Sequence, residues 1–114
     1  VSNALDKVTT DGVDAVVSSD IGAALCVREA MRRHISIPRD LQIIAYDGTY
    51  LTDLAGMKMT AVAQNFDKIA QVAVGNIVRA IAKEGDAKAD TTSATGRKPD
   101  VLIPVTLKLG DTTR

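Results

Sequence analysis

Apolar positions recur along this chain with two spacings, one typical of helices and one of strands. Residues 1–8 have apolar side chains at helical spacing, and Gly12 then suits a left-handed helix end. Residues 14–18 are a short apolar run that predicts a buried strand. Asp20 is placed to cap the helix that follows, which we expect to end near His34. The first third therefore predicts the order helix, strand, helix.

Two further strands are predicted in the middle of the chain. Residues 41–46 are apolar enough for a buried strand, and Asp47-Gly48 then turns the chain. A short helix is expected after Thr49, and residues 59–63 predict a third, weaker strand.

The last third predicts the longest helix and an edge strand. An apolar face repeats at helical spacing from Asn65 or Asp67 to Glu84, whereas residues 86–99 have the composition of a flexible loop. Residues 101–107 predict a final strand, which Pro104 places at a sheet edge because proline cannot donate a ladder hydrogen bond. Alternating strands and helices indicate an α/β fold with a parallel sheet in a three-layer sandwich.

Composition and charge exclude several classes of protein. The 114 residues suit one compact domain, 46% of them are hydrophobic, and 14 basic residues balance 14 acidic ones. This neutral balance indicates that the chain does not bind nucleic acid or a membrane surface by itself. Cys26 is the single cysteine, so we expect no disulfide, no metal site and a cytoplasmic location. We also expect no cofactor.

Hydrogen-bonding side chains follow all three parallel strands. In open parallel sheets, ligands bind beyond the carboxyl ends of the strands. Carboxylate, amide and hydroxyl groups suit the hydroxyls of a sugar, and an aromatic face can cover the apolar side of the sugar ring. The sequence therefore predicts a ligand site from Ser19, Asp20, Asp47, Gln64 and Phe66.

Each of these residues also has a purely structural interpretation. Asp20 could only cap a helix, and Asp47 could only turn the chain before Gly48. Gln64 could be an exposed loop residue, and Phe66 could belong to the core. No serine, cysteine or carboxylate is evident as a partner for His34, so we expect no catalytic residue and no enzyme activity.

Four segments, in order, resemble the LacI/GalR family of transcriptional regulators. The segment from Ile37 to Gly48 matches that family's Val/Ile-Pro-x-Asp element and the following Tyr/Phe-Asp. The other three matching segments are residues 14–24, 59–66 and 102–107. Residues 46–49 and 102–107 are most similar to the branch of the family that controls sucrose operons in Gram-positive bacteria.

The resemblance implies that residues 1–114 are the C-terminal subdomain of a periplasmic-binding-protein-like effector domain. A sugar or sugar-phosphate effector would contact Ser19, Asp47, Gln64 and Phe66, with Asp20 beside them as a direct or indirect contact. Ser19 departs from the asparagine that is usual in the family.

The resemblance also implies partners. Dimerisation would use the helix after Asp20, so Leu25, Arg28 and Arg32 are candidate interface residues of a homodimer, or else a solvated face. Operator DNA would be bound only through a headpiece that precedes Val1, and no membrane partner is expected.

Three rival functions differ in what they require. A sugar-binding protein of a transport system would have the same fold but would need an export signal. A small α/β enzyme would need a nucleophile with a base, or a metal cluster, at the strand ends. A response-regulator-like module would need clustered acidic residues after the first strand.

Overall fold

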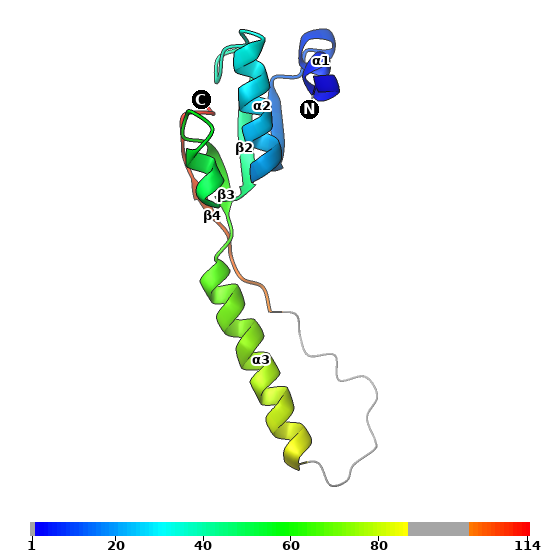
Figure 1. Ribbon diagram of the computed structural model, residues 1–114, viewed down its shortest axis with the longest axis vertical. Helices are drawn as coiled ribbons and strands as arrows, with labels where there is room; N and C mark the ends of the chain where they lie inside the picture. The colour runs from blue at the N-terminus through cyan, green and yellow to red at the C-terminus, as the bar shows by residue number, and fades with distance from the viewer. Residues whose placement is uncertain (1, 87–100) are drawn as a thin grey trace. The chain divides into compact units, whose positions relative to one another are not determined.

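The computed structural model describes residues 2–86 and 101–114 of the chain. These residues form two compact units (Figure 1). The sheet unit comprises Val1–Gln64 with Val105–Arg114, and the helix unit is Asn65–Pro104. The loop expected at residues 86–99 lies outside the described residues, except for Asp86, which ends a helix.

The sheet unit contains a four-stranded sheet in the order β1-β2-β3-β4. The strands are β1 (Ala15–Ser19), β2 (Gln42–Asp47), β3 (Thr60–Ala63) and β4 (Thr106–Lys108). β1, β2 and β3 are parallel, and β4 lies antiparallel to β3 at the edge. The predicted α/β fold and the edge position of the last strand are confirmed, but β4 is shorter than the predicted 101–107.

Within residues 2–86 and 101–114, four helical elements accompany the strands. They are α1 (Ser2–Asp11), α2 (Asp20–Arg32), the single 3-10 turn η1 (Tyr50–Asp53) and α3 (Phe66–Asp86), of which α3 belongs to the helix unit. Gly12 follows α1 with a φ of 68°, the left-handed conformation expected there. The Asn65 side chain accepts from Lys68 N at 2.9 Å, so Asn65 caps α3 as one of the two predicted candidates.

The predicted cap of α2 is wrong by one residue. The Ser19 hydroxyl accepts a hydrogen bond from Gly22 N at 3.4 Å, which makes Ser19 the N-cap and leaves Asp20 in the first turn. Both residue types cap helices well, so their order along the chain could not decide between them. The side chain of Asp20 is used elsewhere.

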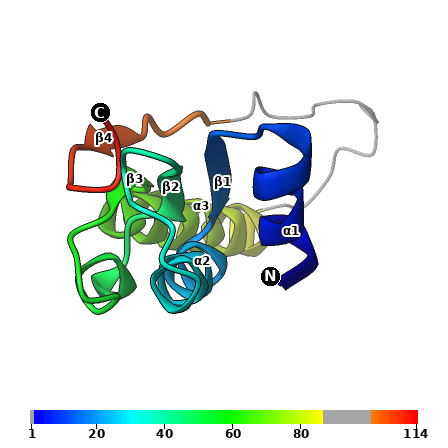
Figure 2. The same cartoon turned by 90° about the horizontal axis from the view of Figure 1, so that it is seen from above.

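The core of the sheet unit is aliphatic, as the scarcity of aromatic residues predicts. α2 and η1 lie on the same side of the sheet (Figure 2), and α2 contributes Ala23, Val27 and Ala30, all fully buried. They pack with Ile43 and the other buried residues of the strands. Cys26 is also buried, and this burial raises the pKa of its thiol.

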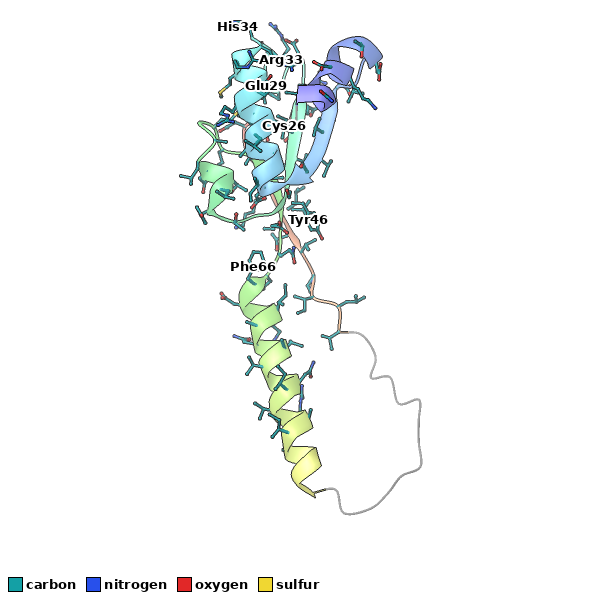
Figure 3. The ribbon with its side chains drawn as sticks, turned by 45° about the vertical axis from the view of Figure 1, so that its right-hand side comes forward. Cys26, Glu29, Arg33, His34, Tyr46 and Phe66 are labelled. Atoms are coloured by element: carbon teal, nitrogen blue, oxygen red, sulfur yellow. The ribbon has the colours of Figure 1, made fainter. Side chains whose placement is uncertain are left out.

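Arg33 joins the first two helices by ion pairs. Its guanidinium lies 2.6 Å from Asp6 of α1 and 2.7 Å from Glu29 of α2 (Figure 3). Arg32 also pairs with Glu29, and hydrogen bonds from both arginines lower the pKa of that carboxyl to about 2.

The C-terminal segment is joined to the middle of the sheet through Thr112. Its hydroxyl donates to Ile43 O at 2.5 Å and accepts from Thr60 N at 2.9 Å, and its carbonyl accepts from Ile43 N at 2.9 Å. Thr112 has no exposed surface, and its bonds join β2 and β3 near their amino ends, away from the carboxyl edge described next.

In the described part of the chain, no helix is both long and apolar enough to cross a membrane. No group of three metal-ligating side chains comes together within those same residues.

Candidate functional site

The carboxyl ends of the three parallel strands lie along one edge of the sheet. Ser19 pairs in register with Tyr46, and Asp47 pairs with Ala63. The predicted residues Ser19 and Asp47 therefore end neighbouring strands, and Gln64 directly follows the third. The edge presents a hydroxyl, a carboxylate and an amide from segments far apart in the sequence.

Asp47 and Gln64 are joined directly. Gln64 Nε2 donates to Asp47 Oδ1 at 2.5 Å, and Gln64 N donates to the Asp47 carbonyl at 2.9 Å. Both side chains are half-buried. The amide fixes the orientation of the carboxylate. Asp47 Oδ2 and Gln64 Oε1 take no part in this side-chain bond, so each can accept a hydrogen bond from a ligand hydroxyl.

The backbone at Asp47 is strained. Its φ is 125°, a region that residues other than glycine rarely adopt. Such a conformation costs about 1–3 kcal/mol and persists only where neighbouring contacts impose it. Gly48 follows with a φ of 72°, and a Cβ there would overlap Ala63. The turn is thus held against β3 in a shape that sets the direction of the Asp47 side chain.

Asp20 supplies the contacts that hold this turn. Its carboxylate accepts hydrogen bonds from Gly48 N at 3.2 Å, from Thr49 N at 2.6 Å and from Thr49 Oγ1 at 2.6 Å. Only 2% of Asp20 is exposed. A buried carboxylate with three protein donors is committed to the turn, so Asp20 positions Asp47 through the backbone.

Ser19 and Phe66 stand differently from the paired residues. Ser19 is exposed, and its hydroxyl accepts from Gly22 N, so it caps α2 and is not part of the Asp47–Gln64 pair. Phe66 is 49% exposed, so it is not core in the structure, and it begins α3 in the helix unit. Asp47 and Gln64 are therefore brought together, Asp20 lies behind them, and Phe66 belongs to the other unit.

Thr49 was not predicted as part of the site. It donates its hydroxyl to Asp20, and that hydroxyl also accepts from Leu51 N at 3.4 Å as the cap of η1. A threonine between a glycine turn and a short helix is a recognisable capping signal. The bond to Asp20 joins residues 29 positions apart, which local sequence cannot indicate.

The chemistry of the site is that of recognition. Asp47 contacts an amide, which cannot exchange a proton with it at ordinary pH, so the pair is no acid–base couple. His34 follows the carboxyl end of α2, whereas Tyr46 lies near the opposite end of that helix, at the site edge of the sheet (Figure 3). The described groups at this edge are suited to a ligand with several hydroxyls.

Comparisons with known proteins agree in the fold. A family model described as a periplasmic binding protein-like domain matches residues 5–113. The chain is 28% identical over 107 residues to the sucrose operon repressor of Streptococcus mutans, covering 94% of this chain and 29% of that repressor.

Two solved structures are similar in fold. One is a LacI family transcriptional regulator from Arthrobacter in complex with lactose, with a TM-score of 0.77 and 17% identity over 97% of this chain and 39% of that one. The other is a ribose operon repressor from Lactobacillus acidophilus, with a TM-score of 0.74 and 24% identity over 99% of this chain and 38% of that one. The chain thus spans well under half the length of these relatives.

Proposed function

Since the chain belongs to the periplasmic binding protein-like domain family, we propose that it is the C-terminal, effector-binding half of the sensor domain of a LacI-type transcriptional repressor. The effector is a sugar or a sugar phosphate, and the genes that the protein regulates serve carbohydrate use. The protein acts in the cytoplasm. The observation that carries the proposal is the Asp47–Gln64 pair, oriented at the shared edge of parallel strands.

In this proposal each group has a separate part in binding. Asp47 Oδ2 and Gln64 Oε1 accept from sugar hydroxyls, and Ser19 contributes a third polar contact from the neighbouring strand. Asp20 touches no ligand and holds the turn in place. A ligand that lacks the correct hydroxyls leaves these groups unpaired, which costs affinity.

Regulation follows from differential affinity. The relatives are more than twice as long as this chain, and the remaining part of such a protein would supply the second wall of the cleft and a DNA-binding headpiece. A sugar that binds one cleft geometry more tightly shifts the protein towards it, by no more than the difference in affinity.

The proposal includes a homodimer through α2 and η1. A groove of about 290 Å³ lies between them and is lined by Ile21, Leu25, Arg28 and Leu54 among others. Ile21 is 63% exposed and Leu54 is 68% exposed, so apolar surface faces solvent there.

Charge complementarity favours a second copy of the chain as the occupant of this groove. Arg28 and Asp53 are exposed, and neither has an ion pair among those formed by the described residues. In a two-fold dimer, Arg28 of each copy can pair with Asp53 of the other. Arg32 already pairs with Glu29 and contributes less.

A saccharide titration tests the ligand site. We expect sucrose, lactose or ribose to shift the amide resonances of residues 19, 47–49 and 64 saturably, and Asp47→Asn to weaken that binding about tenfold or more. Asp14→Asn is the matched control, because Asp14 is exposed just before the amino end of β1. Shifts that are absent with every sugar, or unchanged in Asp47→Asn, contradict the proposal.

A further inference from the structure

A second recess lies in the sheet unit, beside η1 and the β3–β4 edge. Its volume is about 360 Å³, and the residues that line it come from three places: 48–50 with 52–53, then 58–59, and Lys108. Asp47 and Gln64 do not line it. The recess is therefore distinct from the proposed sugar site, although Gly48 adjoins both.

The floor of the recess is fixed by buried residues. Thr52 is 8% exposed and Met59 is 1% exposed. Met59 N donates to Thr52 O at 2.9 Å, and Thr52 Oγ1 donates to Thr49 O at 2.9 Å. Because these bonds join η1 to the start of β3, the recess is already formed without a ligand.

Two lysines reach this recess from distant parts of the chain. Lys108 of β4 is directly opposite Ala61 of β3, which places both side chains on one face of the sheet. Lys58 is held by its backbone, since its carbonyl accepts from Asp111 N at 2.6 Å. The fold itself therefore brings two lysines to the lining of one hollow.

The charges of the recess are not balanced from within. Its titratable lining consists of Lys58, Lys108, Asp53 and the phenol of Tyr50. The ion pairs formed in the described part of the chain involve neither lysine and do not involve Asp53. Two cations facing one carboxylate leave a net positive hollow, and each ammonium offers only hydrogen-bond donors.

We propose that this recess binds a small oxyanion of the phosphate class, held between Lys58 and Lys108. The anion is either free inorganic phosphate or the phosphate group of a sugar monophosphate, since both present the same acceptor oxygens. An anion between the lysines balances their positive charge and receives a hydrogen bond from each.

A titration with inorganic phosphate tests the site directly. We expect the amide resonances of residues 48–53 and 58–59 to shift saturably with sodium phosphate and not with sodium chloride at equal ionic strength. Lys58→Gln and Lys108→Gln should each weaken binding about fivefold, the strength of one partly screened charge contact in water. In the monomer, where Asp53 has no partner from a second copy, Asp53→Asn should tighten binding about as much, because it removes the one negative charge in the lining.

Controls separate the site from a general attraction of phosphate to lysine. The double variant Lys7→Gln with Lys68→Gln removes two positive charges from exposed positions elsewhere, twice the change in either single variant, and should leave the affinity unchanged. Equal weakening in this control, or equal shifts with chloride, would overturn the proposal. The single variants and Asp53→Asn, which changes affinity in the opposite direction, keep the test decisive if one variant misfolds.

Two further ligands distinguish the sources of the anion and keep this site apart from the sugar site. If glucose phosphate binds more tightly than inorganic phosphate and shifts the resonances of both the recess and the sugar site, the anion is a sugar monophosphate. Equal affinities identify free phosphate. Phosphate shifts centred on Ser19 and Gln64 would refute the recess and leave the sugar site standing, whereas unphosphorylated glucose that shifts neither region weakens only the sugar proposal.

Discussion

Replacing Asp20 by alanine should lower the free energy of unfolding of the sheet unit more than the same replacement at an exposed aspartate. The carboxylate receives three hydrogen bonds from the turn at Gly48 and Thr49, and it is almost completely buried. A hydrogen bond to a charged group contributes about 1.5–3 kcal/mol, and contributions within one cluster are not additive. We therefore expect Asp20→Ala to lower the free energy of unfolding by about 3 kcal/mol.

Urea unfolding measures this loss. With a slope of about 1.5 kcal/mol per molar, typical of a small protein, the midpoint should fall by about 2 M. Asp14→Ala is the control, because Asp14 is exposed and its backbone carbonyl, which the substitution leaves in place, accepts from Gln42 N at 2.8 Å. It should change the free energy of unfolding by no more than about 0.5 kcal/mol.

A double-mutant cycle with Thr49→Val isolates the contact itself. Thr49 Oγ1 and Asp20 Oδ2 are 2.6 Å apart, so the two substitutions together should cost clearly less than the sum of each alone. The reasoning is refuted if Asp20→Ala costs no more than Asp14→Ala, or if the two effects in the cycle simply add.

Two other predictions concern parts of the fold away from the turn. Thr112→Val leaves Ile43 O and Thr60 N without their buried partner, so it should lower the free energy of unfolding, measured in urea, by about 2–3 kcal/mol. The control Thr106→Val, at an exposed position, should not lower it by that amount. Glu29 has its pKa lowered to about 2 by its two arginine partners, so the stability that it contributes is complete above about pH 4.5 and is lost as the pH falls towards 2. In Glu29→Gln, the free energy of unfolding should therefore fall less steeply with decreasing pH in that range, as measured by unfolding curves at each pH. An equally steep fall in the variant and the wild type would contradict the assigned pKa.

The order of elements followed from local patterns. Apolar spacing predicted α1, α2, α3 and the three parallel strands, because one buried face repeats along each of them. The resemblance to LacI/GalR regulators is confirmed by the relatives found. Strand order at the carboxyl edge also predicted that Asp47 and Gln64 would be neighbours, since parallel strands end on the same side.

What the sequence could not indicate depends on contacts between distant segments. Residues 101–107 have an apolar strand pattern, but only Thr106–Lys108 form strand β4, because pairing depends on the length of β3 and not on apolarity. The role of Asp20 depends on the chain folding back 28 residues later. The bridge through Thr112 depends on a segment 69 residues from its partner Ile43.

The sheet unit is assembled from both ends of the chain, with Asn65–Pro104 inserted between its two parts. During synthesis, β1, β2 and β3 emerge long before residues 105–114, and until then Ile43 and Thr60 lack the partner that Thr112 provides. Shortening the chain by its last few residues should thus release a partly built sheet with open backbone groups, which is a species prone to aggregate.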